Sequence, residues 1–153
     1  YFEGNVVGWT GRSILADKKP KYLTEVQPGF VYGLDEQNYN KSFAIVCEGQ
    51  LDAIHIDGCA LGGSEISDQQ AMLLNRLQKQ IIVCPDRDIA GKKLVEQAID
   101  LGWSVALPDW SSEITDISEA VSKYGRLYTL YSIANTAEDS PLKIRLRAKK
   151  WFT

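Results

Sequence analysis

The chain has 153 residues, of which 44% are hydrophobic and 24% are charged, a composition typical of an ordinary soluble globular protein of about one domain. Its formal net charge of -3 excludes a strongly basic surface, so any binding of nucleic acid would have to use local patches. Three cysteines without a C-x-x-C pair, together with one histidine, predict core thiols in a reducing compartment and no zinc site. No apolar run approaches the ~18 residues of a membrane span, and no signal peptide is visible. The chain opens at Tyr1 without an initiator Met, and we interpret it as a fragment of a longer protein.

The first 41 residues have no clear hydrophobic period. Short strands are predicted at residues 5–9 and 12–15, on either side of Thr10-Gly11, because glycine favours a turn. A polar turn follows at residues 17–20, and the remainder of this segment is predicted to be loop.

From residue 42 onward, short apolar runs alternate with amphipathic segments. Strands are predicted at residues 43–47, 58–61, 81–84 and 104–107, and helices at 50–57, 67–77, 88–101, 117–124, 126–135 and from Pro141 onward. The inner faces are predicted to carry Leu51, Ile54 and His55 in the first of these helices, Leu73, Leu74 and Leu77 in the second, and Ile89, Leu94, Val95, Ala98 and Ile99 in the third. Such alternation predicts right-handed crossovers and a parallel sheet.

Two of the predicted strands stop at acidic residues. The run that begins at Ile45 ends at Glu48, and the run that begins at Ile81 leads to Asp86 and Asp88. Because the carboxyl ends of parallel strands share one edge of a sheet, these side chains are expected to converge there. Clustered carboxylates repel one another, and a hard cation such as Mg²⁺ relieves that repulsion, which indicates phosphoryl or phosphodiester chemistry.

These motifs resemble the TOPRIM domain of bacterial and phage DNA primases. The resemblance rests on E-G-x-x-D at Glu48–Asp52, A-L-G-G at 60–63, and D-x-D followed by I-A-G-K at 86–92. Upstream, V-G-W-T-G-R at 7–12 and P-K-Y-L at 20–23 are similar to primase segments, so the match spans roughly residues 5–121. In the third acidic motif Asp116 aligns, whereas Ser118 stands where the family has a second Asp.

The resemblance implies an α/β fold with a TOPRIM-like open, mainly parallel sheet flanked by helices. It implies three parts: residues 1–41 as an N-terminal strand and loop segment of the primase core, 42–124 as the TOPRIM domain, and 125–153 as a C-terminal helical extension. The implied activity is DNA primase, a nucleotidyltransferase of DNA replication that makes short RNA primers on single-stranded DNA from ribonucleoside triphosphates. The implied setting is the primosome, with a replicative helicase as partner, in the bacterial cytoplasm or a phage-infected cell, and away from the membrane.

The resemblance also assigns roles to particular residues. The expected catalytic residues are Glu48, Asp86 and Asp88. These three, together with Asp52 and Asp116, are the expected ligands of Mg²⁺ or Mn²⁺. Nucleotide or nucleic acid is expected to bind to Arg12 and Lys21. We expect the isolated fragment to be inactive, because the upstream half of the primase core is missing from it.

Structural interpretations remain open beside these roles. Asp52, Asp88 and Asp116 stand where an acid stabilises a helix start. Arg87 and Lys92 are expected to be solvated, and His55 and the four tryptophans to be packing residues. The basic run at residues 143–150 suits either nucleic acid, a helicase surface or solvent. A TOPRIM nuclease or topoisomerase, and a non-enzymatic metal-binding interaction module, are the alternative classes.

Overall fold

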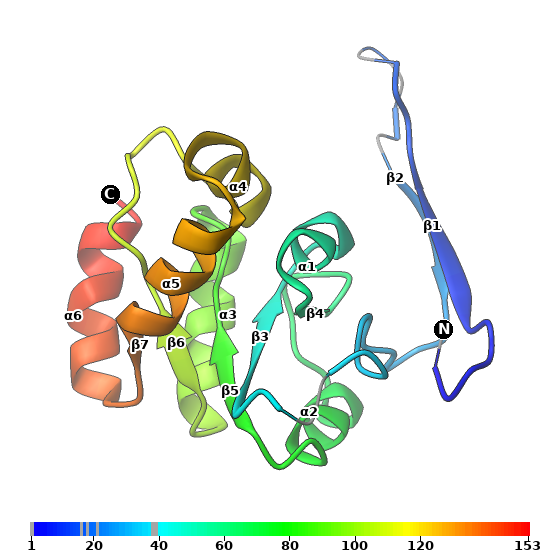
Figure 1. The fold of residues 1–153 in the computed structure, drawn as a ribbon, viewed down its shortest axis with the longest axis horizontal. Coiled ribbons are helices and arrows are strands. Elements are labelled where there is room, and N and C mark those ends of the chain that lie inside the picture. Colours follow the sequence, from blue (N-terminus) through cyan, green and yellow to red (C-terminus); the bar gives the residue numbers. More distant parts are fainter. Residues whose placement is uncertain (1, 16, 18, 21, 38–39) are drawn as a thin grey trace.

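A computed structural model describes residues 2–15, 17, 19–20, 22–37 and 40–153. An α/β body holds a five-stranded sheet, and an N-terminal β-hairpin stands apart from it (Figure 1). Within the described part of the chain, the search for membrane-spanning helices finds none that is both long enough and apolar enough.

The sheet has the strand order β4-β3-β5-β6-β7. Its strands are β3 Phe43–Cys47, β4 Cys59–Ala60, β5 Gln80–Val83, β6 Ser104–Ala106 and β7 Ala137–Glu138. The first four are parallel and almost fully buried, which confirms the predicted parallel sheet. Strand β7 was not predicted; it pairs antiparallel with β6 and is only two residues long. A strand of that length has no period to detect.

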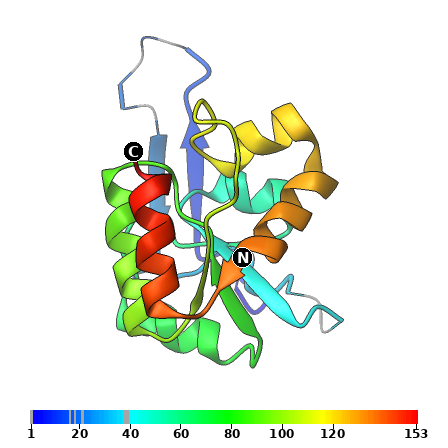
Figure 2. The ribbon, with the colours of Figure 1, turned by 90° about the vertical axis from the view of Figure 1, so that its left-hand side faces the viewer.

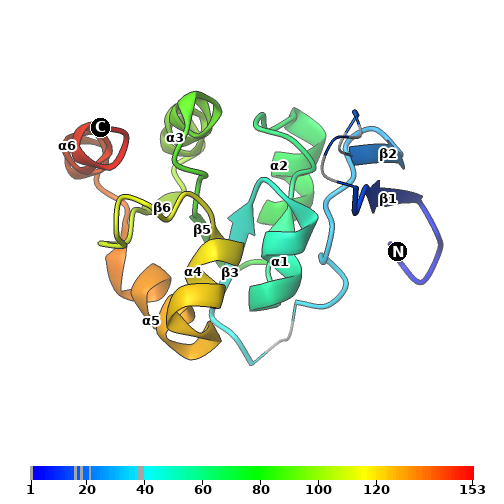
Figure 3. The same cartoon turned by 90° about the horizontal axis from the view of Figure 1, so that it is seen from above.

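Three helices cover each face of the sheet (Figure 3). One face carries α1 Gln50–Ile56, α4 Ile117–Tyr124 and α5 Arg126–Thr136, and the other carries α2 Asp68–Asn75, α3 Ile89–Asp100 and α6 Pro141–Trp151. Local signals set several of the helix starts. Ser67 and Gln70 form the predicted capping box, and Pro141 occupies the first turn of α6.

The predicted inner face of α1 is wrong. Leu51 and Ile54 are 38% and 53% exposed, and His55 is also exposed. The helix instead buries Asp52 together with Ala53 and Ile56. A seven-residue helix has too few positions for hydrophobic periodicity to define its inner face. The hydrogen bonds that Asp52 accepts from α4 offset the cost of removing its carboxylate from water.

The inner face of α3 is confirmed except at its start. Leu94, Val95 and Ala98 are buried in the core, whereas Ile89, the first helical residue, is 86% exposed. Ile89 directly follows the N-cap Asp88, and apolar spacing at a helix start does not by itself predict burial.

The hairpin differs most from prediction. β1 Gly8–Arg12 pairs antiparallel with β2 Tyr22–Val26, so the first strand runs straight through Thr10-Gly11 and the second occupies a predicted loop. Gly8 marks a close approach of backbones, since a Cβ there would lie 2.3 Å from the Glu25 carbonyl oxygen. Trp9 is 53% exposed on this hairpin, so its predicted packing role is wrong, whereas Trp103, Trp110 and Trp151 are buried as expected.

Candidate active site

The first pair of acids lies at the carboxyl ends of β3 and β5. The two strands are neighbours in the sheet, and the Cys84 N–H donates to the Val46 carbonyl at 2.9 Å just before the strands end. Glu48 follows directly, and its Oε1 accepts the N–H of Asp86 at 3.4 Å. The structure therefore brings Glu48 and Asp86 together, as the strand order required.

Both carboxyls of this pair are hard to ionise. The pKa of Glu48 is raised to about 7, mainly by burial and also by the charges of Asp88 and Asp52, against an opposing hydrogen bond from the Asp86 N–H. The pKa of Asp86 is raised to about 8, again mainly by burial and then by the charges of Glu48, Asp52, Asp116 and Asp88. Burial and the neighbouring carboxylates therefore both oppose ionisation of this pair.

Asp88 has a structural role that is visible directly. It is the N-cap of α3, and its Oδ1 accepts the N–H of Gly91 at 2.8 Å. Gly91 is buried, and a Cβ there would lie 2.0 Å from the Asp86 carbonyl oxygen. The start of α3 therefore fits closely against the loop that carries both acids of the D-x-D motif.

Asp52 is 7% exposed and is anchored by α4. Its Oδ1 accepts the N–H of Ser118 at 2.8 Å and the Ser118 hydroxyl at 2.6 Å. The Ser118 Oγ also lies 3.1 Å from the Nδ1 of His55. Sequence reasoning missed Ser118 as a partner of Asp52, because it appeared only as a departure from an acidic motif.

Asp116 completes the acidic set as the N-cap of α4. Its Oδ1 accepts the N–H of Glu119 at 2.7 Å. Burial raises the pKa of Asp116, as do the charges of Asp52 and Glu119, while hydrogen bonds from the backbone of Glu119 and Ser118 lower it. The pKa shifts of Asp86 and Asp116 both include a contribution from Asp52, which places all three in one electrostatic neighbourhood.

In this conformation the acids do not form a finished cation site. Among the residues that the structure describes, no three His, Cys, Asp or Glu side chains are grouped so as to hold a metal ion. The carboxylates of Asp52, Asp88 and Asp116 accept hydrogen bonds from helix N–H groups. The donor chemistry nevertheless fits a hard cation, because only oxygen ligands are present and a cation would reverse the raised pKa values of Glu48 and Asp86.

Arg87, between the two acids of the D-x-D motif, is not solvated as predicted. Its Nη1 donates to the Ser111 carbonyl at 3.0 Å, and its Cζ lies 3.8 Å from the ring centroid of Trp151. Lys92 is exposed, as predicted, with its Nζ 5.5 Å from the ring centroid of Phe152. Arg87 therefore links the acidic loop to the C-terminal helix.

Of the two predicted phosphate-binding residues, Arg12 lies on the hairpin. Arg12 ends β1 and is exposed, whereas Lys21 lies outside the described residues. In Figures 1 and 2 the hairpin rises beyond the sheet edge at which β3 and β5 end. Several cations of the C-terminal basic run contact other groups of this chain. The ion pairs are Lys143–Glu138 at 3.5 Å, Arg145–Glu96 at 2.8 Å and Lys150–Asp109 at 3.7 Å. Arg147 donates a hydrogen bond to the Thr136 carbonyl at 2.9 Å.

Comparison with known proteins places this arrangement in a family. Residues 45–121, about half of the chain, match the family described as Toprim-like, and the chain belongs to that family. Its sequence is 30% identical over 141 residues to the DNA primase of Aquifex aeolicus (strain VF5), and the match covers 80% of this chain. The chain spans only 28% of that primase's length.

Solved primase structures have the same fold. The zinc-binding and RNA polymerase domains of the Aquifex aeolicus primase superpose with a TM-score of 0.71 at 25% identity, over 97% of this chain and 44% of that one. A DnaG primase catalytic domain solved bound to single-stranded DNA gives a TM-score of 0.65 at 22% identity, over 85% and 47%. The resemblance to the TOPRIM domain of DNA primases is thereby confirmed, as is the predicted fold class.

Proposed function

We propose that this chain is the metal-binding TOPRIM part of a DNA primase, which makes short RNA primers on single-stranded DNA from ribonucleoside triphosphates. The observation that carries the proposal is the pair Glu48 and Asp86, which lie at neighbouring strand ends and whose pKa values are raised to about 7 and about 8, chiefly by burial and then by nearby carboxylates. Sequence similarity to DNA primases supports the choice of reaction. The three parts 1–41, 42–124 and 125–153 belong to the proposal, with β7 of the third part joining the central sheet.

Glu48, Asp86 and Asp88 would hold the Mg²⁺ or Mn²⁺, with Asp52 and Asp116 as further anionic oxygens. A bound cation of this kind supplies charge stabilisation to phosphate oxygens during nucleotidyl transfer. Of the chain's own residues, Ser118 fixes Asp52 through two hydrogen bonds, and Gly91 lets α3 start directly against the loop of Asp86. These contacts preorganise the acidic loops before substrate arrives.

Arg12 and Lys21 would receive the phosphates of template or nucleotide. Both residues lie in segments that resemble primase sequences, which favours them over the C-terminal basic run. A replicative helicase as partner, and a location in the bacterial cytoplasm or a phage-infected cell, belong to the same proposal.

Primer synthesis by the full-length protein tests the proposal. With Mg²⁺, ribonucleotides and a single-stranded template, we expect short RNA, and Glu48→Gln should slow its synthesis by about a hundredfold or more, because a direct role is worth roughly 2–3 kcal/mol. Glu113→Gln, at a carboxylate whose side chain is 81% exposed, is the matched control and should keep activity. Metal-dependent cutting of DNA without any RNA product, stopped by Glu48→Gln, would replace primase with a TOPRIM nuclease.

A further inference from the structure

Arg87 stands between two acids in the chain but pairs with neither. It directly follows Asp86 and directly precedes Asp88. Among the residues that the structure describes, no ion pair joins its guanidinium to a carboxylate. It donates instead to two backbone carbonyls, that of Ser111 from Nη1 at 3.0 Å and that of Trp110 from Nη2 at 3.5 Å. Carboxylates are the stronger partners of a guanidinium, so other contacts set the direction of this side chain.

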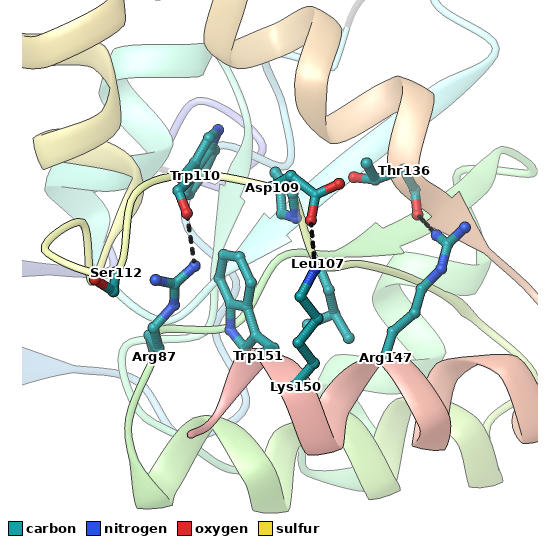
Figure 4. A pocket seen from close by; sticks show the side chains of 10 residues that line it. Arg87, Leu107, Asp109, Trp110, Ser112, Thr136, Arg147, Lys150 and Trp151 are labelled. Atoms are coloured by element: carbon teal, nitrogen blue, oxygen red, sulfur yellow. Dashed lines mark hydrogen bonds and ion pairs between the residues drawn. The ribbon is translucent and has the colours of Figure 1, made fainter.

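The ring of Trp151, the last residue of α6, sets that direction. The Cζ of Arg87 lies 3.8 Å from the ring centroid of Trp151, within the range of a cation–π contact, and Figure 4 shows the guanidinium and the ring side by side. Trp151 is 7% exposed, and its ring in turn packs on the ring of Trp110, with the two centroids 5.9 Å apart. The end of α6 therefore presents a packed ring face to Arg87.

Arg87 also ties the loop of the D-x-D motif to the segment between β6 and α4. Its backbone N–H donates to the Thr115 carbonyl at 2.7 Å, and its side chain reaches the carbonyl of Ser111 in the same segment. That segment leads directly into Asp116, the N-cap of α4. Two acidic loops are therefore joined through one residue, and the side-chain contacts of that residue depend on α6.

This contact leaves buried donors without a partner. Neither the Nε of Arg87 nor the Nε1 of Trp151 has a hydrogen-bond partner among the described residues. Buried N–H groups are nearly always paired, because an unpaired one loses its hydration without compensation. Departures from such rules are concentrated at functional sites. The pair is a poor choice for stability alone, which indicates a role in the neighbouring acidic site.

We propose that Arg87 and Trp151 are positioning residues for the acids of the D-x-D motif. The ring of Trp151 holds the Arg87 side chain, and Arg87 holds the loop in which Asp86 and Asp88 stand; we call this pair the Arg87–Trp151 clamp. The inference rests on the proposed function of the two acids as ligands of Mg²⁺ or Mn²⁺. The C-terminal helical extension thereby supports the cation site without supplying a ligand to it.

Electrostatics alone gives the opposite expectation for Arg87. Its positive charge stands next to two proposed ligands in the chain, so removing that charge should favour a bound cation. A positioning role requires that removing the same side chain disfavours the cation, because the acids lose their fixed loop. The sign of the change in cation affinity therefore separates the two roles.

Titration with Mn²⁺, followed by electron paramagnetic resonance of the free ion, tests the clamp. Trp151→Leu keeps an apolar side chain and removes the ring face, whereas Arg87→Met keeps the apolar stem and removes the guanidinium. Each variant should weaken Mn²⁺ binding by roughly tenfold, the lower end of the effect of losing a residue that orients metal ligands. The double variant should stay within about twofold of the weaker single variant, since both changes break the same clamp.

Two further variants are matched controls. Trp151→Phe keeps a ring face and loses only an N–H without a partner, so its Mn²⁺ affinity should stay within about threefold of the parent chain. Phe152→Leu removes the adjacent ring, whose centroid lies 5.5 Å from the Nζ of Lys92, and should stay within about twofold. A loss in Phe152→Leu as large as in Trp151→Leu would overturn the proposal, and so would Mn²⁺ binding that is unchanged or tighter in Arg87→Met.

Hydrogen exchange of the metal-free chain tests the clamp independently of the cation. The N–H of Gly91 donates to the Oδ1 of Asp88 at 2.8 Å, so its exchange rate reports how firmly the loop is held. Trp151→Leu and Arg87→Met should each speed this exchange by roughly tenfold or more, and Phe152→Leu should not. Unchanged exchange in the first two variants would overturn the clamp. Absence of Mn²⁺ binding in the parent chain would count against the proposed function alone, and hydrogen exchange would still decide whether the clamp holds the loop.

Discussion

Gly91→Ala is expected to destabilise the chain by disturbing the loop that carries the D-x-D acids. The added Cβ would lie 2.0 Å from the carbonyl oxygen and 3.1 Å from the carbonyl carbon of Asp86, so backbone must move. Forced overpacking costs about 1–3 kcal/mol, and weakening the cap from Asp88 adds about 1 kcal/mol. The better helix propensity of alanine returns about 1 kcal/mol. The free energy of unfolding should therefore fall by about 1–3 kcal/mol.

Urea unfolding followed by circular dichroism measures this loss, and the melting temperature should fall by about 2–4 °C per kcal/mol for a chain of this size. Gly63→Ala is the matched control, because a Cβ there meets no heavy atom within 4 Å and the backbone has no positive φ. We expect the control to stay within about 0.5 kcal/mol of the parent. A Gly91→Ala chain as stable as the Gly63→Ala chain would refute the close approach of α3 to Asp86.

Three further outcomes are expected. Ser118→Ala should lower the free energy of unfolding by about 1–3 kcal/mol, because buried Asp52 loses a hydrogen-bond donor. Ser122→Ala, on the exposed side of α4, should change the free energy of unfolding little. Equal losses in the two variants would contradict a stabilising hydrogen bond between Ser118 and Asp52. The free energy of unfolding of the metal-free chain should fall between about pH 5 and pH 8. The raised pKa values of Glu48 and Asp86 make the folded state hold protons that the unfolded state releases in this range. Urea midpoints that rise with pH over this range would contradict the expectation. In salt-dependent anisotropy titrations with single-stranded DNA, Arg12→Ala and Lys21→Ala should each reduce the salt slope by about one unit, and Lys149→Ala should not; the reverse result would move the DNA contact to α6.

The central sheet was predictable because its signals are local. Buried parallel strands appear as continuous apolar runs, and their acidic ends fix the edge at which Glu48 and Asp86 meet. The capping box of Ser67 and the N-cap of Asp88 are likewise determined by a few neighbouring residues. These local signals therefore suffice to predict that Glu48 and Asp86 lie close together.

The remaining features depend on partners far apart in the chain. Asp52 is buried only because Ser118, 66 residues away, supplies two donors. Arg87 leaves solvent because Trp151 of α6 contacts it with a ring face and the Ser111 carbonyl accepts its hydrogen bond. Strand β1 continues straight through Gly11 because β2 pairs with it. This pairing was not predicted, because a glycine at this position indicated a turn. The hydrophobic periodicity of one segment carries no information about contacts with residues far away in the chain.

The claim that Glu48 and Asp86 hold a divalent cation is tested most directly by calorimetric titration of the chain with Mn²⁺. We expect weak binding that tightens as pH rises from about 6 to 9, because protons compete for carboxyls whose pKa values are about 7 and about 8. The double variant Glu48→Gln, Asp86→Asn should abolish binding, and Asp100→Asn, at an exposed acid on α3, should retain it. Equal affinity in the double variant and the parent chain would contradict the proposed site.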